Sequence, residues 1–231
     1  MARTDDVIDA IKAMIMSGEL CPGDRLPVEP DLAAQLDVSR GSLREGVRSL
    51  IAMGVLEARQ GAGTYVTSLD IRLLFAPMEF VSDLNHHDPV EFLQVRRVLE
   101  CEAASLAAAR IDVRGLQAAK EWLDQARAVA ESSQSTDHER ILECDRGFHE
   151  VIAEASGNQA LAALLAVFAG RTWRLRTLRS EIDAHAVEIA VREHQAILDA
   201  LRDGDSERAR VLMHVHLLGV EDFARLHSTA S

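Results

Sequence analysis

The spacing of apolar residues over the first 68 positions predicts three helices followed by a β-hairpin. Apolar residues recur at helical spacing in the first three segments, and the last two are short runs that indicate strands joined by a glycine-containing turn. The expected elements are helices at 4–17, 29–36 and 40–53 and strands at 55–59 and 64–67. Ser39 is a good N-cap for the third helix, and the turn Gln60-Gly61-Ala62-Gly63 joins the strands. This order of elements is that of a winged helix-turn-helix.

From about residue 70 the chain is rich in Ala, Leu and Glu, with long stretches that contain no Gly or Pro, and this composition favours helices. Helix-breaking and capping residues, among them the expected caps Asp137 and Asn158, divide it into about seven segments. The helices are expected at 72–83, 89–110, 112–131, 137–156, 158–180, 182–203 and 205–226. The predicted fold is therefore mostly α, with an N-terminal winged helix and a C-terminal all-α bundle. The domains expected are 1–68 for DNA binding, 69–88 as a linker and connecting helix, and 89–231 as the helical domain.

Charge and composition narrow the classes of function. The net charge of the chain is −12, which argues against nucleic acid binding over the whole surface. Residues 1–68 hold 7 Lys+Arg against 10 Asp+Glu, a net of −3, so any DNA contact depends on where the charges lie. The three cysteines are scattered, no apolar run is long enough to cross a bilayer, and the N-terminal residues lack the apolar core of a signal peptide. We therefore expect a cytoplasmic protein with no membrane partner.

The predicted helix 40–53 carries Arg40, Arg44 and Arg48 on the face opposite its apolar stripe. An arginine fork can bond guanine in the major groove or clamp a phosphate, and Ser39 and Ser42 at the helix start can donate to phosphate. Three arginines at this spacing would, taken alone, favour an ordinary solvated face. Their place in a short helix, tight turn, second helix and hairpin favours DNA recognition instead.

Four side chains on predicted inward faces could form a metal site. Asp145 and His149 lie one turn apart on the helix 137–156, while His194 and His216 each lie on the apolar stripe of a later helix. A buried carboxylate is costly unless it is paired or coordinated, and three imidazoles with one carboxylate suit a divalent transition metal. A single inward histidine is more often a hydrogen-bonded core residue. From these residues alone, a metal site and a set of ordinary core histidines are about equally favoured.

The N-terminal segment resembles the winged helix of the GntR family of bacterial regulators. The matching residues include Pro22-Gly23, Leu26-Pro27, Glu29, Leu32-Ala33, Val38-Ser39-Arg40, Leu43-Arg44-Glu45 and the wing Gly61-x-Gly63-Thr64. The resemblance implies that Arg40 and Arg44 read bases and that Ser39, Gly41 and Ser42 lie against the DNA backbone. It places Gln60 and Gly61 at the tip of a wing that enters the minor groove, and Gly63 belongs to the same wing. Pro30 departs from the pattern, because the family often has a basic residue there.

Residues 89–226 resemble the FCD effector domain of the FadR subgroup of that family. The matching words are Val95-Arg96-x-x-Leu99-Glu100, Leu106-Ala107-Ala108, Asp145-x-x-Phe148-His149, Ser156-Gly157-Asn158, Glu193-His194-x-x-Ile197-Leu198 and Met213-x-x-His216-Leu217. The resemblance implies a divalent metal held by Asp145, His149, His194 and His216, with Zn²⁺ expected and Ni²⁺, Mn²⁺ or Fe²⁺ as alternatives. It also implies a small carboxylate effector, for which Arg96 is the candidate contact; a salt bridge from Arg96 to Glu100 is equally favoured.

These expectations combine into a non-enzymatic, homodimeric transcription regulator, by expectation a repressor, that binds an operator in double-stranded DNA and responds to a carboxylate metabolite. Two other functions stay open. The helical domain could be a metalloenzyme tethered to DNA, because an open metal position can activate water. The metal could instead be purely structural, in which case its removal lowers the melting temperature and no metabolite changes DNA binding.

Overall fold

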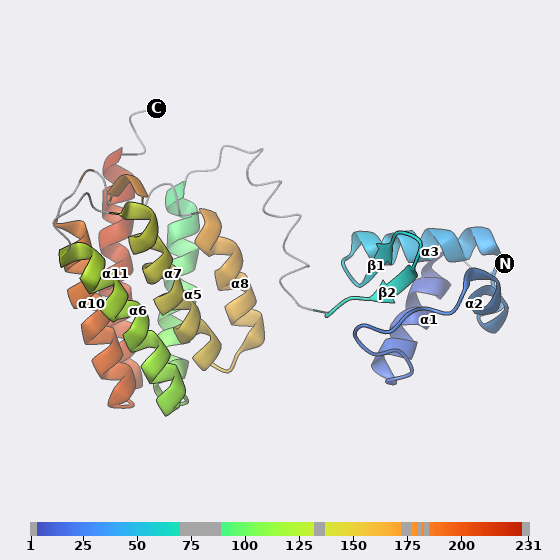
Figure 1. The fold of residues 1–231 in the computed structure, drawn as a ribbon, viewed down its shortest axis with the longest axis horizontal. Helices are drawn as coiled ribbons and strands as arrows, with labels where there is room; N and C mark the ends of the chain where they lie inside the picture. The colour runs from blue at the N-terminus through green and yellow to red at the C-terminus, as the bar shows by residue number, and fades with distance from the viewer. Residues whose placement is uncertain are drawn as a thin grey trace. The chain divides into compact units, whose positions relative to one another are not determined.

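The computed structural model describes residues 4–69, 89–131, 137–171, 177–179, 182 and 185–227. The chain divides into two compact units, residues 1–74 and 75–231, which are drawn with their element labels in Figure 1. The division falls inside the predicted connecting segment 69–88. The helix predicted at 72–83 lies outside the described residues, as does part of the helix predicted at 158–180.

The N-terminal unit contains the predicted elements in the predicted order. They are α1 (Thr4–Met16), α2 (Glu29–Gln35), α3 (Arg40–Ala52), β1 (Leu56–Arg59) and β2 (Gly63–Val66). The hydroxyl of Ser39 accepts a hydrogen bond from the backbone N–H of Ser42 at 3.0 Å, and it thereby caps α3 as expected. Helix α1 packs on α3, and one core cluster that includes Ile11, Leu43 and Leu50 joins the elements.

The hairpin differs from the prediction at three strand ends, each by one residue: β1 begins at 56 instead of 55, and β2 spans 63–66 instead of 64–67. Strands β1 and β2 are antiparallel, and Arg59 pairs with Gly63, which was predicted to be the last residue of the turn. Gly61 and Gly63 have φ values of 72° and 116°, a backbone region that side chains with a Cβ rarely adopt. The wing tip therefore consists of residues 60–62.

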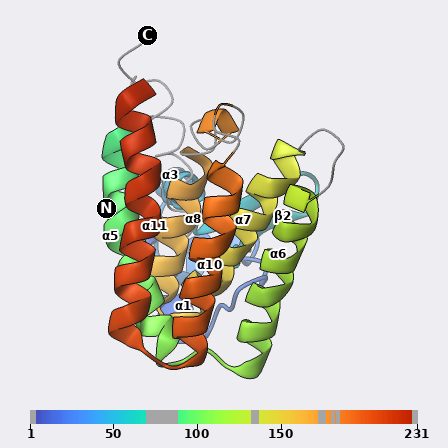
Figure 2. The same ribbon diagram turned by 90° about the vertical axis from the view of Figure 1, so that its left-hand side faces the viewer.

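The C-terminal unit is a bundle of long helices. They are α5 (Pro89–Ala108), α6 (Val113–Glu131), α7 (His138–Ala155), α8 (Gln159–Arg171), α10 (Ala186–Arg202) and α11 (Ser206–His227). Figure 2 shows α5 beside α11 and α6 beside α10, and the contacts between these pairs agree. Asp137 and Asn158, both expected as helix caps, accept backbone N–H groups at 3.0 and 3.1 Å. The mostly α fold class is confirmed, and among the described helices none is both long and apolar enough to cross a bilayer.

Candidate metal centre and DNA-reading surface

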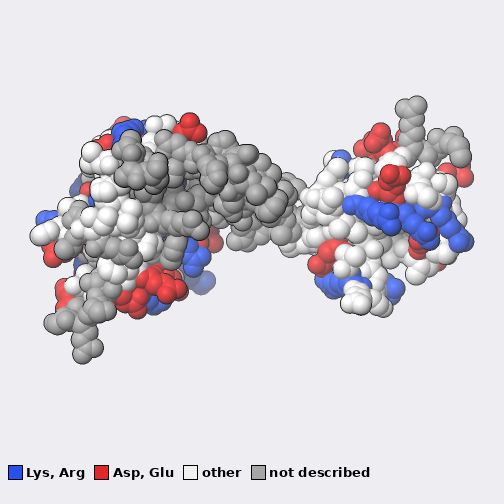
Figure 3. Space-filling model, turned by 90° about the horizontal axis from the view of Figure 1, so that it is seen from above, with Lys and Arg blue, Asp and Glu red and all other residues white. Residues whose placement is uncertain are grey.

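The arginine face of α3 is exposed. Arg40, Arg44 and Arg48 all point to solvent, whereas Leu43 and Leu50 on the opposite side are buried. In Figure 3 a band of basic surface crosses the N-terminal unit, on the side where Figure 1 draws α3, with acidic surface beside it. Basic groups are therefore gathered on one face of a unit whose net charge is negative, as DNA recognition through this helix requires.

One acidic residue lies on this face. The Nε of Arg44 donates to Oε2 of Glu29, at the start of α2, at 2.9 Å. The hydrogen bond from Arg44, together with the charges of Arg44 and Arg40, lowers the pKa of the Glu29 carboxyl below its usual value. This pair joins the first residue of α2 to the predicted reading helix, and sequence reasoning assigned no role to Glu29.

The wing brings a further arginine next to this helix. A Cβ added to Gly63 would lie 2.7 Å from Nε of Arg25, so the Arg25 side chain crosses the wing where no side chain projects. Arg25 is exposed and lines a groove of about 340 Å³ together with Glu29, Arg44 and Arg48. Sequence reasoning missed Arg25. A basic residue directly before Leu26-Pro27 was the available indication, but only the folded hairpin shows that it reaches the wing.

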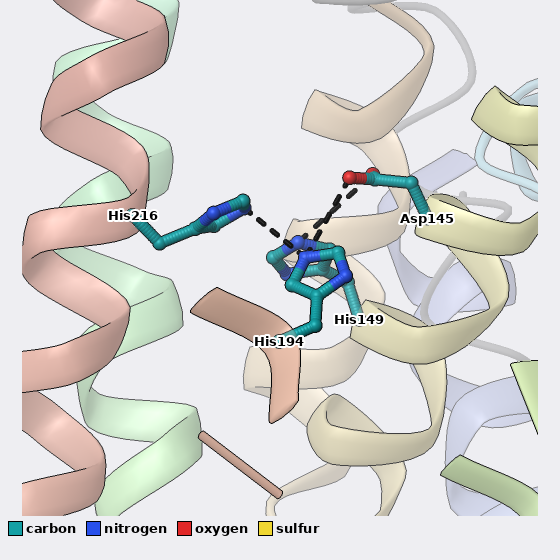
Figure 4. Close-up of side chains that lie close together, drawn as sticks. All are labelled: Asp145, His149, His194 and His216. Atoms are coloured by element: carbon teal, nitrogen blue, oxygen red, sulfur yellow. Dashed lines mark hydrogen bonds and ion pairs between the residues drawn. The ribbon is translucent and has the colours of Figure 1, made fainter. Parts of the chain in front are cut away.

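The four predicted metal ligands lie together inside the helical unit. Asp145, His149, His194 and His216 each offer one ligand atom, and these atoms all lie within 4.8 Å of one another. Figure 4 shows the side chains from α7, α10 and α11 converging on one point. The Nε2 atoms of His194 and His216 are 3.2 Å apart, and Nε2 of His194 is 3.7 Å from Oδ1 of Asp145. With metal–nitrogen bonds of about 2.0–2.1 Å, two nitrogens on one metal lie about 3.0–3.4 Å apart. The distance of 3.2 Å between the Nε2 atoms of His194 and His216 therefore suits two ligands of one metal.

Two glutamates orient the imidazoles from outside the cluster. Nδ1 of His149 donates to Oε2 of Glu100 at 3.0 Å, and Nδ1 of His216 donates to Oε2 of Glu193 at 2.7 Å. An ionised carboxylate only accepts hydrogen bonds, so both Nδ1 atoms carry a proton, and in the neutral imidazoles that can bind a metal the two Nε2 atoms would then present their lone pairs to the centre. Burial raises the pKa of the Glu193 carboxyl. A carboxylate behind a ligating histidine is the common outer partner of metal sites.

The donor set fits a divalent cation. Nε2 of His149 is buried and makes no hydrogen bond to any residue that the structure describes. A buried lone pair without a donor is costly, and a cation at the convergence point would satisfy it. The side chains of His149, His194 and His216 are 5, 4 and 3% exposed, so bulk water does not provide that donor.

Arg96 lies behind Glu100 and not among the four ligands. Its guanidinium donates to Oε1 of Glu100 at 2.9–3.0 Å, and the side chains of both residues are 2% exposed. Burial acts to raise the pKa of Glu100, but its interactions with His149 and Arg96 outweigh burial and lower the pKa to about 2. The salt bridge, one of the two roles considered for Arg96, is thus present. Contact with an effector stays a prediction.

The other histidines within the described residues do not join the cluster. His214 bonds Arg97 at 3.2 Å, His138 and His227 are half-buried, and His185 is exposed. His86 and His87 lie outside the described residues.

The comparisons with known proteins agree with both halves of the chain. The model described as "Bacterial regulatory proteins, gntR family" matches residues 3–66, and the FCD domain model matches residues 91–219. The chain belongs to the GntR family. The HTH-type transcriptional regulator LutR of Bacillus subtilis (strain 168) is 31% identical over 215 residues, which are 90% of this chain and 95% of LutR. The Exu regulon transcriptional regulator of Escherichia coli (strain K12) is 31% identical, over 90% of this chain and 78% of that protein.

A solved structure supports the same family. Streptococcus agalactiae GntR aligns with a TM-score of 0.76 and 27% identity, covering 95% of this chain and 99% of that one. The chain is therefore a DNA-binding transcription regulator of the GntR type with an FCD effector domain. The predicted family, fold class and regulatory function are confirmed at this level.

Proposed function

We propose that this GntR regulator is a homodimeric, cytoplasmic repressor whose operator affinity is controlled by a small carboxylate bound beside a divalent metal in the FCD domain. The observation that supports it is the convergence of Asp145, His149, His194 and His216, with two of the imidazoles fixed by carboxylates from behind. A bound metal would supply a fixed positive charge and coordination positions for oxygen ligands. Zn²⁺ suits this donor set best, and Ni²⁺, Mn²⁺ and Fe²⁺ are alternatives.

The effector class follows from the charge of this centre and from one relative. The Escherichia coli (strain K12) protein named "Putative L-lactate dehydrogenase operon regulatory protein" is 30% identical over 93% of this chain and 83% of its own length. L-lactate is a small carboxylate that also carries a hydroxyl, so it is a reasonable first ligand to test. Arg96 remains our candidate contact from the protein, because its charge lies next to Glu100, one hydrogen bond from His149.

On the DNA side, we assign base reading to Arg40 and Arg44, and phosphate contacts to Arg48 and the helix start at Ser39, Gly41 and Ser42. The wing tip at Gln60 and Gly61 enters the minor groove, with Gly63 allowing Arg25 to lie across the wing and contact the backbone. Two protomers present two reading helices to two half-sites. The effector must bind one arrangement of the dimer more tightly than the other, since otherwise it does not shift the equilibrium between them and operator affinity stays the same.

The test uses an operator selected from random DNA by the wild-type protein. We expect L-lactate or a related hydroxy acid to weaken operator binding by wild type and not by His149→Ala/His194→Ala. If metal removal lowers only the melting temperature and no carboxylate changes DNA binding, the metal is structural and the sensing proposal fails. Turnover of a carboxylate by the metal-loaded protein would instead support the tethered enzyme.

A further inference from the structure

The ion pair between Glu29 and Arg44 links the two helices of the helix-turn-helix. Glu29 begins α2 and Arg44 lies in the second turn of α3, so the pair bridges two elements across the helix-turn-helix. The side chain of Arg44 is 63% exposed and that of Glu29 is 34% exposed. Arg44 makes no other hydrogen bond or ion pair with the part of the chain that the structure describes.

The contact uses one edge of the guanidinium. Glu29 accepts from Nε, on the side of the fork, at 2.9 Å. An arginine that recognises guanine uses two parallel N–H bonds to O6 and N7, and the terminal pair of nitrogens can supply both. A carboxylate on the Nε edge therefore does not block base recognition. It restricts the rotation of a long, exposed side chain and so limits where the terminal nitrogens point.

The same carboxylate opposes DNA binding through its charge. Glu29 lines the basic groove with Arg25, Arg44 and Arg48, where phosphates would approach. A negative group there weakens attraction to every DNA sequence alike, because phosphate contacts do not depend on the base sequence. An acidic residue in this place lowers overall affinity, so its usefulness must lie in selectivity.

We propose that Glu29 is a positioning residue that sets the base specificity of Arg44: it holds the guanidinium in the orientation that recognises one base, while its charge lowers affinity for DNA of every sequence. The inference rests on the proposed base-reading role of Arg44. It differs from a plain electrostatic role, in which Glu29 would change affinity for every sequence by the same factor.

The experiment measures binding of full-length, metal-loaded protein to the selected operator, to operators altered at single base pairs, and to random DNA. Arg44→Ala identifies the base pair that Arg44 reads. Glu29→Gln removes the charge and weakens the hold on Nε. Glu45→Gln is the matched control, because it makes the same chemical change next to Arg44 on α3, at an exposed residue with no ion pair among the described side chains.

At the base pair that Arg44 reads, a bidentate contact should give wild type at least about fivefold discrimination between the correct and the altered operator. We expect Glu29→Gln to reduce this ratio by at least about twofold while it tightens binding to random DNA. Glu45→Gln should leave the ratio unchanged. In the Arg44→Ala background, Glu29→Gln should no longer alter discrimination at that pair.

If Glu29→Gln changes the affinity for every DNA sequence by the same factor, as Glu45→Gln does, Glu29 acts only as a charge. The inference is then wrong, while the regulator function stands. If Arg44→Ala changes no base preference, the base-reading role itself fails. Equal melting temperatures of the variants show that these differences do not come from unfolding.

Discussion

Replacing Glu100 by Gln should damage both stability and metal binding, because this carboxylate serves two partners at once. Its Oε1 holds the guanidinium of Arg96 and its Oε2 accepts from His149, and the side chains of Arg96 and Glu100 are 2% exposed. Removing one partner of a buried ion pair leaves the other charge uncompensated, which costs about 3–5 kcal/mol. Loss of the carboxylate behind a ligating histidine typically weakens metal binding by about 10–100-fold.

The effect of Glu100→Gln on stability can be measured for the helical part of the chain separately. Trp122 and Trp173 are the two tryptophans of the chain and both follow residue 89, so fluorescence during urea unfolding reports on the helical part alone. We expect Glu100→Gln to lower the free energy of unfolding of the helical part by about 3–5 kcal/mol. The control is Asp124→Asn, which removes an exposed carboxylate that pairs with Lys120 and Arg127 and should cost about 1 kcal/mol or less.

A double variant separates the two roles of Glu100. Arg96→Met with Glu100→Leu replaces the buried pair by apolar side chains, which often restores or improves stability. Metal affinity should stay low, because Nδ1 of His149 still lacks its acceptor. The reasoning is refuted if Glu100→Gln unfolds within about 1 kcal/mol of wild type and binds metal equally well.

Two further predictions concern thiols and DNA affinity. At pH 8 a colorimetric thiol reagent should react rapidly with one cysteine per chain, the exposed Cys21, because Cys101 and Cys144 are buried and burial raises their pKa values, that of Cys101 to about 11; three rapid thiols in the folded protein would contradict this burial. Arg25→Ala should weaken binding to all DNA sequences and reduce the dependence of log affinity on log salt by about one unit, as measured by fluorescence anisotropy at several salt concentrations. A loss confined to a single base pair would instead make Arg25 a base reader.

The sequence allowed most elements to be predicted because their ends are marked by local chemistry. Ser39, Asp137 and Asn158 cap helices in the structure through the side-chain oxygens that made them recognisable. The wing was misjudged at Gly63 because a glycine at positive φ suits a turn and a strand end equally.

The four candidate ligands could also be named from the sequence, since each lies on the inward face of a predicted helix. The resemblance to the FCD domain, and not the residue pattern, favoured a metal site over ordinary core histidines. The hydrogen bonds of His149 to Glu100 and of His216 to Glu193 were not predicted, because contacts between helices depend on the rotation of each helix about its axis. The contacts of Arg25 and Glu29 were missed for a similar reason, because they form between segments far apart in the chain.

The most direct test of the account is the metal content of the protein purified without chelators, measured by elemental analysis for wild type and for His149→Ala/His194→Ala. We expect about one divalent transition metal per wild-type chain and none in the double variant, with both proteins folded by circular dichroism. Absence of metal from the wild type, or equal metal in both proteins, would contradict the four-residue site and the sensing mechanism built on it.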